Sequence, residues 1–231
     1  MAKYLPGVVT ADARGTIGSL VFTRGPYGNT IRELAIPINT RTGPQQAVRA
    51  NLKNLASRWA QVLDDTQRDN WIALAGTPAA EKTDTLHQVY HPTGLNLFLG
   101  LNQALKQIHA ATIDNAPASL IISDPTSITL AWTAPAGPLT VNASVEPQPH
   151  EIPVVFATRA LPPGRRNTIS LKSQLDYFTA GTAGPWDITA DWATKHGAFV
   201  LGFTITIGLK YTNDQTGFQS ALILAQVFLS P

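Results

Sequence analysis

Cysteine is absent from the 231-residue chain, and this absence excludes two kinds of structure. Without cysteine there can be neither a disulfide framework nor a thiolate metal site. Long apolar runs are also missing, since no stretch approaches the roughly 20 apolar residues that a membrane-spanning helix needs. The first residues, MAKYLPGVVTADARG, lack the apolar run of a secretory signal. We therefore expect synthesis in the cytoplasm, with an oxidising destination neither required nor excluded.

Charged side chains are few, at 14% of the residues, whereas 44% are hydrophobic. This composition supports a packed core in one large or two small domains and excludes global disorder. The net charge of +2 is unevenly placed, because residues 1–62 carry eight basic and two acidic side chains. A basic N-terminal segment suits an acidic protein surface or nucleic acid. Nucleic acid is the less favoured partner, since arginines spread along a hairpin are more often simply solvated.

The N-terminal stretch predicts an arm followed by a β-hairpin. Residues 1–14 form the expected arm, because Pro6 and Gly7 interrupt any strand pairing. Residues 16–23 and 29–36 have the composition of strands, and the RGPYG between them suits a tight turn. A lone hairpin is marginal in water, so it must pack on the following helices, on another domain or on another copy of the chain.

Three helices are expected after the hairpin. The first begins near Thr42 and Pro44, and its apolar residues recur at steps of three and four, which predicts an amphipathic, half-buried helix. These residues are Val48, Leu52, Leu55, Trp59 and Val62. Asp64 or Asp65 caps the second helix, with Gln67 in capping-box position. Thr93 caps a third helix over 95–109.

The C-terminal half changes to strand-type sequence. Residues 111–118 are typical of a linker, and five or more short β-type runs separated by Pro, Gly and Asn follow. These runs predict an antiparallel β-sandwich over 119–231, so the fold class is α+β. The expected organisation is an arm (1–14), a hairpin and helical domain (15–110), a linker (111–118) and the sandwich.

Four N-terminal segments resemble a group of tailed-bacteriophage proteins regarded as virion structural components. They are GTIGSLVFTRGPYGNTIR, PINTRTGPQQAVR, LDDTQRDNW and TGLNLFLGLN, between residues 15 and 102. Such proteins pair an N-terminal hairpin and helices with a C-terminal sandwich. The segments ITLAWTAP and YTNDQTGFQSA look similar to immunoglobulin or fibronectin type III modules, although Arg165–Trp192 departs from a seven-strand pattern.

Two constellations could carry chemistry. His87 and His91 are four residues apart, as metal ligands on a helix would be, but Pro92 disfavours a helix there and the only further ligand is Asp84. We therefore prefer two loop histidines and expect no metal site. Asp187 and Asp191 beside Trp186 and Trp192 suit a glycosidase or sugar-binding site, or equally a short helix whose tryptophans pack on the sandwich. No phosphate-binding loop or nucleophile elbow is present.

The leading hypothesis is a non-enzymatic bacteriophage virion protein, made in the host cytoplasm and located in the virion. It would be a capsid-associated, decoration or head-to-tail subunit, without cofactor, that binds other virion proteins and copies of itself as a homo-oligomer. The expected partner-contacting residues are Arg14, Arg24, Tyr27, Arg32, Arg165 and Arg166. The alternative is a carbohydrate or host-surface binding module, with Tyr177, Trp186 and Trp192 as stacking residues.

Overall fold

The computed structural model describes residues 2–3, 14–25, 28–35, 42–83, 89–133, 137–162 and 172–230, with the side chains of 2–3, 24–25 and 28–30 left out of that description. The described part contains four α-helices and antiparallel sheets, which is an α+β fold. The chain divides into two compact units, Met1–Ala47 and Val48–Pro231. The hairpin and the helices, which the sequence grouped over 15–110, therefore lie mainly in different units.

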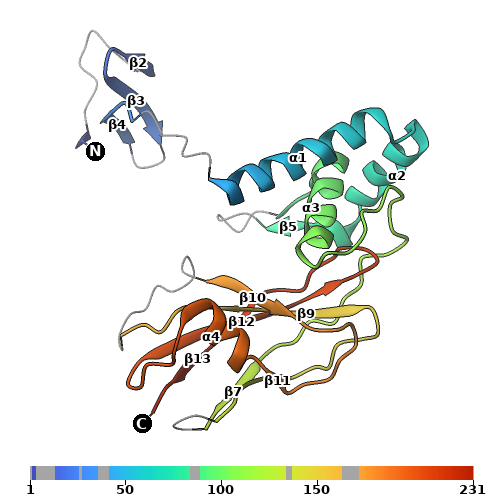
Figure 1. The fold of residues 1–231 in the computed structure, drawn as a ribbon. Helices are drawn as coiled ribbons and strands as arrows, with labels where there is room; N and C mark the ends of the chain where they lie inside the picture. The colour runs from blue at the N-terminus through green and yellow to red at the C-terminus, as the bar shows by residue number, and fades with distance from the viewer. Residues whose placement is uncertain are drawn as a thin grey trace. The chain divides into compact units, whose positions relative to one another are not determined.

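The N-terminal unit is a small antiparallel sheet of four strands (Figure 1). In chain order these are β1 (Ala2–Lys3), β2 (Gly15–Ile17), β3 (Leu20–Gly25) and β4 (Gly28–Glu33), and they pair in the order β1-β4-β3-β2. The expected hairpin is β3–β4. The expected first strand is interrupted at Gly18, whose positive φ of 59° turns the chain back, so that β2 becomes a separate strand beside β3.

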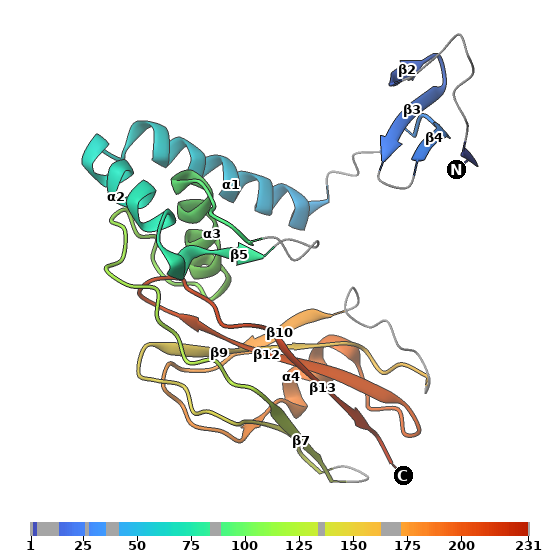
Figure 2. The ribbon, with the colours of Figure 1, turned by 180° about the vertical axis from the view of Figure 1, so that it is seen from behind.

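Three helices begin the second unit (Figure 2). They are α1 (Gly43–Gln61), α2 (Asp65–Ala75) and α3 (Gly94–Gln107), with a 3-10 turn at Pro78–Ala80 and two short paired strands, β5 (Lys82–Thr83) and β6 (Val89–Tyr90), before α3. The caps predicted for α2 and α3 are present. At the start of α2, the Asp64 carboxylate accepts from the backbone N–H of Gln67 at 2.7 Å, and the side-chain oxygen of Gln67 accepts from the backbone N–H of Asp64 at 3.1 Å. At the start of α3, the Thr93 hydroxyl accepts from the backbone N–H of Asn96 at 3.2 Å.

The segment that follows α3 is tied to all three helices. Buried Asn102 of α3 donates to the Ile113 carbonyl at 3.1 Å and accepts from the Ile113 amide at 2.8 Å. Arg58 of α1 forms a two-point ion pair with Asp114, and the Trp71 indole of α2 donates to the Asp114 carbonyl at 2.7 Å. The arginine lowers the Asp114 pKa through the side-chain hydrogen bond. Residues 111–118, expected to be a linker, thus belong to the packed helical layer.

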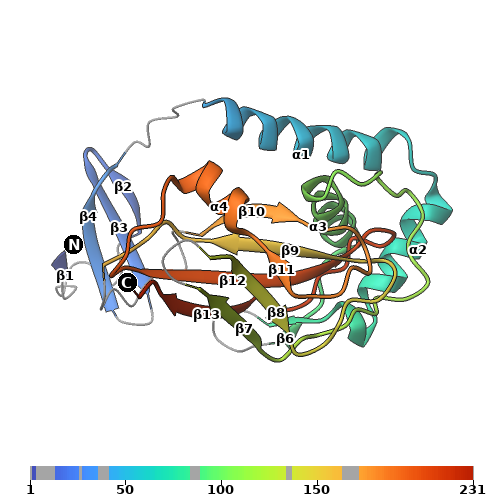
Figure 3. The same ribbon diagram turned by 60° about the horizontal axis from the view of Figure 1, so that its bottom comes forward.

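Two antiparallel sheets form the rest of the unit (Figure 3). One has the order β10-β9-β12-β13 and the other β11-β8-β7. Their bounds are β7 (Ile128–Trp132), β8 (Leu139–Ala143), β9 (Glu151–Ala157), β10 (Ser173–Tyr177), β11 (Trp186–Asp187), β12 (Thr204–Asn213) and β13 (Ile223–Phe228), with α4 (Thr189–His196) between β11 and β12. Inward residues of both sheets, including Val141, Val155 and Leu209, share one core. Strand β7 has the alternation of a half-buried strand, with Ile128 buried and Thr129 exposed.

Helix α3 packs on the β10-β9-β12-β13 sheet, on the face that points away from the core shared by the two sheets. Leu105 and Ile108 lie against Val154 of β9 in a small apolar cluster. Beside it, the half-buried ammonium of Lys210 on β12 donates to Gln107 Oε1 at 3.1 Å and to Gln219 Oε1 at 3.0 Å, and it lies 5.1 Å from the centre of the Phe156 ring. Burial lowers the pKa of Lys210 to about 8. The helices and the two sheets of this unit are therefore packed together, not merely connected.

Among the described residues, no helix combines the length and the apolar character that crossing a membrane requires.

Gly94 is required where α3 crosses α2, because a Cβ there would lie 2.8 Å from Ile72 Cγ1 and 2.9 Å from the Ile72 amide nitrogen. We expect Gly94→Ala to reduce the free energy of unfolding by about 1–3 kcal/mol through overpacking. Gly100→Ala in the same helix is the matched control. No atom lies within 4 Å of its Cβ, so it should be neutral or stabilising by about 0.5–1 kcal/mol. Chemical denaturation measures both, and equal effects would contradict this packing.

Lys210 makes stability depend on pH above 8. The native state loses this proton near pH 8, whereas the unfolded chain keeps it to about 10.5, so the unfolded state binds more protons in between. We expect the wild type to gain stability over this range relative to Lys210→Met, by up to about 2 kcal/mol once partial screening by solvent is included. Denaturation at pH 7, 8.5 and 10 measures the difference, with exposed Lys106→Met as the control. If the difference in unfolding free energy between the wild type and Lys210→Met does not change with pH, the ammonium group of Lys210 is solvated.

Candidate partner-binding surfaces

The N-terminal sheet has one apolar and one polar face. Residues opposite each other in neighbouring strands project to the same side, and alternate residues of a strand project to opposite sides. Phe22 pairs with Ile31 and Leu20 with Ile17, so these four apolar residues share one face, which also carries the charged Glu33 opposite Leu20. Val21 pairs with Thr16 and Arg32, and together with Thr23 they form the opposite, mostly polar face. This alternation of apolar and polar residues is typical of an antiparallel sheet that packs one face against other residues and exposes the other to solvent.

Little covers the apolar face within the described part of the N-terminal unit itself. Ile17 is 68% exposed and Leu20 42%, while Phe22 and Ile31 are half-buried. No described side chain of the N-terminal unit is buried. Covering an exposed aliphatic side chain stabilises by about 1.5–3 kcal/mol, and isolated small sheets without a buried face are marginal in water. This face is therefore the first candidate for partner contact.

Only some of the sequence-predicted contact residues fall in the described part. Arg14, directly before β2, and Arg32 on β4 have exposed side chains. The backbone of Arg24 pairs with Asn29, but its side chain lies outside the description. Tyr27, Arg165 and Arg166 also lie outside the described residues. The two arginines that are described flank the polar side and the edge of the sheet, where they could meet carboxylates of a partner.

Helix α1 is the second candidate surface. Of its predicted apolar stripe only Leu55 is buried, and Trp59 packs half-buried against Phe98 with ring centroids 5.4 Å apart. Val48 is 60% exposed and Leu52 43%, and Val62 is exposed as well. The expected half-buried helix is thus packed only along its C-terminal half, and two apolar side chains of its N-terminal half face outward.

Shallow cavities follow the flank of α1 toward α3. One of about 370 Å³ is lined by residues that include Asn54, Leu55 and Arg58, and another of about 210 Å³ includes Val48 and Gln103. Asn51 and Lys106 line both, so the two are neighbours along the helix. Amides and a lysine around a partly apolar hollow offer hydrogen bonds to a polypeptide surface.

The tryptophans proposed for ligand stacking are core residues. Trp186 is 2% exposed and donates to the Thr182 carbonyl at 3.1 Å. Trp192 is 1% exposed, stacks on Phe199 with centroids 4.3 Å apart, and donates to the Thr158 carbonyl at 3.0 Å. A sugar stacks on an accessible ring face, and burial this complete leaves neither ring such a face. The stacking role suggested for these two residues therefore does not agree with their positions.

The remaining candidates lie in β10, β11 and α4. Tyr177 is half-buried at the end of β10, with its ring 5.8 Å from that of His109 and packed beside the α3 cluster. Asp187 accepts from the Thr189 amide at 2.9 Å where α4 begins. The pKa of Asp191 is raised, first by burial and then by the carboxylates of Asp176 and Asp187.

The histidine pair is only partly described. His91 Nε2 lies 3.6 Å from Glu81 Oε1, while His87 lies outside the description. Within the described ranges, no three His, Asp or Glu side chains are grouped as metal ligands would be.

Comparisons of the chain with protein-family models, with curated protein sequences and with solved structures found no match. Its function must therefore be inferred from its own residues.

Proposed function

We propose that this chain is a non-enzymatic structural subunit that acts through repeated protein–protein contacts. The observation that carries the proposal is the N-terminal sheet, whose described residues include exposed Ile17 and Leu20 on one face and no buried side chain. Such a sheet is stabilised when a partner covers it. Helix α1, with one buried residue in 19, adds a second surface of the same kind.

In the proposed contact, a neighbouring subunit would cover the apolar face of the N-terminal sheet and add a strand at its edge. Among the described strands, β2 is an edge strand of three residues, and a strand of a neighbour would pair with its outward backbone groups. Arg14 and Arg32 would pair with carboxylates around that contact. Arg24, Tyr27, Arg165 and Arg166 remain proposed contact residues on sequence grounds alone.

Within this class, the N-terminal motifs support a component of a tailed-bacteriophage virion. The resemblance spans about residues 15–102, which includes the exposed sheet and the three helices. A capsid-associated, decoration or head-to-tail subunit repeats its contacts many times, so a surface that is weak in one copy suffices in the assembly. The proposed partners are other virion proteins and further copies of the chain, and the proposed location is the virion.

For the C-terminal sheets, the strand order supports an immunoglobulin- or fibronectin III-like sandwich as the finer fold. If the seven strands β7 to β13 are given the letters A to G in chain order, one sheet contains A, B and E (β7, β8 and β11), as in that class. The other sheet contains C, F and G (β9, β12 and β13), again as in that class. The fourth strand, β10, pairs with β9, whereas a constant-type immunoglobulin domain places its fourth strand beside A, B and E.

The exposed sheet face can be tested directly with the double variant Ile17→Lys, Leu20→Lys. Two charged side chains on the contact face should lower incorporation into virus particles at least tenfold, because each covered aliphatic side chain contributes about 1.5–3 kcal/mol. Co-sedimentation of the chain with particles from an infected culture measures the occupancy.

Ile121→Lys is the matched control, since Ile121 is an exposed isoleucine of the second unit. It should leave the occupancy unchanged. Incorporation of the double variant at the wild-type level would overturn the role of this face, and absence of the wild-type chain from particles would overturn the virion assignment.

A further inference from the structure

Strand β13 is an end strand of its sheet and carries none of the features that usually protect such an edge. Among the described strands it pairs only with β12, in a register that runs over Ile223–Phe228 without a bulge. Natural edge strands are commonly protected by a charged side chain, a proline or a bulge. The sequence of β13, ILAQVF, has neither a charge nor a proline, and residues 197–209 and 215–230 around it contain no charged side chain at all.

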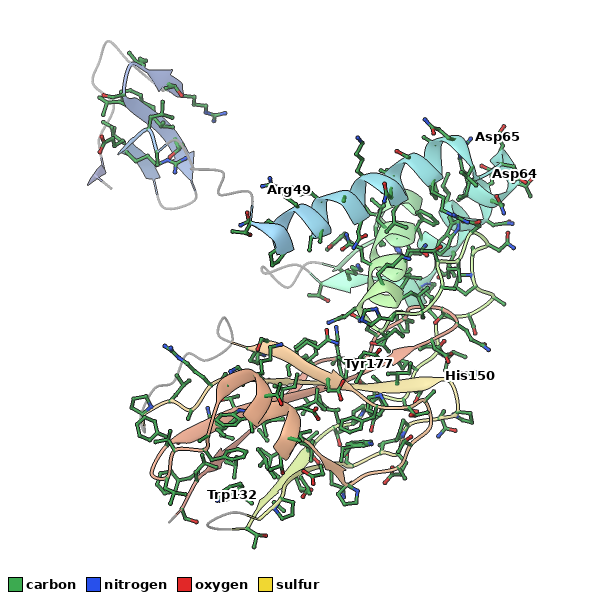
Figure 4. The ribbon with its side chains drawn as sticks, viewed as in Figure 1. Arg49, Asp64, Asp65, Trp132, His150 and Tyr177 are labelled. Atoms are coloured by element: carbon green, nitrogen blue, oxygen red, sulfur yellow. The ribbon has the colours of Figure 1, made fainter. Side chains whose placement is uncertain are left out.

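The opposite edge strand of the same sheet, β10, is protected. Its pairing with β9 is shifted by a bulge between Gln174 and Asp176, and Asp176 itself places a carboxylate in the strand. Tyr177, the last residue of β10, packs against the cluster that contains Leu105 of α3 (Figure 4). The absence of protection is therefore a property of the β13 edge and not of the whole sheet.

The outer face of β13, which points away from the core shared by the two sheets, is apolar and exposed. Leu224 is 38% exposed, Phe228 52%, and Leu222, directly before the strand, 42%. Alternate residues of a strand project to the same side, so these three side chains share one face. Leu222 and Leu224 reach over Gly208 of β12, since each has a methyl carbon 3.0 Å from the position of a Cβ on that glycine. An apolar surface without charge is typical of the centre of a protein–protein contact.

Every second residue of β13 directs its backbone groups to the open edge. The Leu229 amide donates to the Phe203 carbonyl at 2.9 Å, and the Leu229 carbonyl accepts from the Gly202 amide at 2.7 Å, so both backbone groups of Leu229 face the β12 side. In an antiparallel pair, successive residues direct these groups alternately toward the partner strand and away from it. The residues whose N–H and C=O groups point away from β12 are therefore Leu224, Gln226 and Phe228.

We propose that β13 of one copy pairs antiparallel with β13 of a second copy, so that the two four-stranded sheets become one continuous sheet. This deepens the proposed function, on which it rests, by naming one contact between copies of the chain. With Gln226 of both copies on the two-fold axis, Leu224 of each lies opposite Phe228 of the other, and the outward backbone groups of all three residues are paired. Aliphatic and aromatic side chains directly opposite each other stabilise such a pair of strands.

A second copy is the partner that this edge fits. An edge strand is complementary to itself when it is turned about a two-fold axis, and an uncharged strand meets its own copy without like-charge repulsion. A different partner selected by charge would need a charged group here, and β13 offers none. The contact is closed, so it forms dimers and not filaments. Six residues a side bury little area, so the dimer is weak by itself and is reinforced where the other contacts of the assembly repeat.

Charge substitution at Gln226 tests the proposal on the full-length chain, because its exposed side chain would face its own copy. Gln226→Lys and Gln226→Glu should each lower the dimerisation constant at least tenfold, since two like charges then lie directly opposite each other. An equimolar mixture of the two variants should recover association, because the introduced lysine of one then faces the introduced glutamate of the other. Analytical ultracentrifugation of purified protein at low salt measures all three.

Gln103→Lys and Gln103→Glu are the matched controls. They place the same charges on an exposed glutamine of α3 and should dimerise like the wild type.

The outcomes separate this contact from the proposed function. Recovery in the mixture supports the two-fold contact, since a folding defect in one variant could not be repaired by the other. Self-association that neither Gln226 variant reduces, or that the mixture does not recover, overturns this contact and leaves the proposed function standing. A wild-type chain that stays monomeric yet enters virus particles does the same, whereas a monomer that enters none overturns both.

Discussion

Apolar surface that the described residues of the N-terminal sheet leave exposed is the constraint on which the proposed function depends. In the N-terminal sheet the register places Ile17, Leu20, Phe22 and Ile31 on one side, and no described side chain of that unit is buried. Four strands without a buried face gain too little from burial to offset the conformational entropy that ordering them costs. In the assembly that we propose, a partner that covers the face supplies the missing burial and so stabilises this unit.

The second unit shows what a completed structure looks like in the same chain. Its two C-terminal sheets enclose a core that includes Trp192 and Tyr211. The connection from the helices to these sheets is held by Asn102 and by the Arg58–Asp114 pair. Helix α3 rests on β9 through Leu105 and Val154. The N-terminal half of α1 is less packed, since Val48 is 60% exposed and Leu52 43%.

The sequence predicted the local features well, because their signals are local. The capping box at Asp64 and Gln67, the cap at Thr93 and the β3–β4 hairpin are all present, since each depends on residues within a few positions of one another. The break at Gly18 was missed because its neighbours have strand-type composition, and only the positive φ separates β2 from β3.

Features set by distant residues could not be predicted. A period of three to four marks the stripe of α1 as apolar, but it does not show which of its residues are packed: Leu55 is buried, whereas Val48 is 60% exposed. Trp186 and Trp192 beside two aspartates suited a sugar site equally well, and only the positions of Thr182 and Thr158 show that both indoles are satisfied inside the core. The linker-like composition of 111–118 likewise gave no sign of the hydrogen bonds from Asn102.

The most direct measurement of the central claim is hydrogen–deuterium exchange of the backbone amides of β2, β3 and β4, in the dilute free chain and in the assembled particle. If a partner completes the sheet, these amides exchange rapidly in the free chain and become strongly protected on assembly, while those of β9 and β12 are protected in both states. Strong protection of β2–β4 already in the free chain, unchanged on assembly, would show that the sheet is stable alone and would contradict the account.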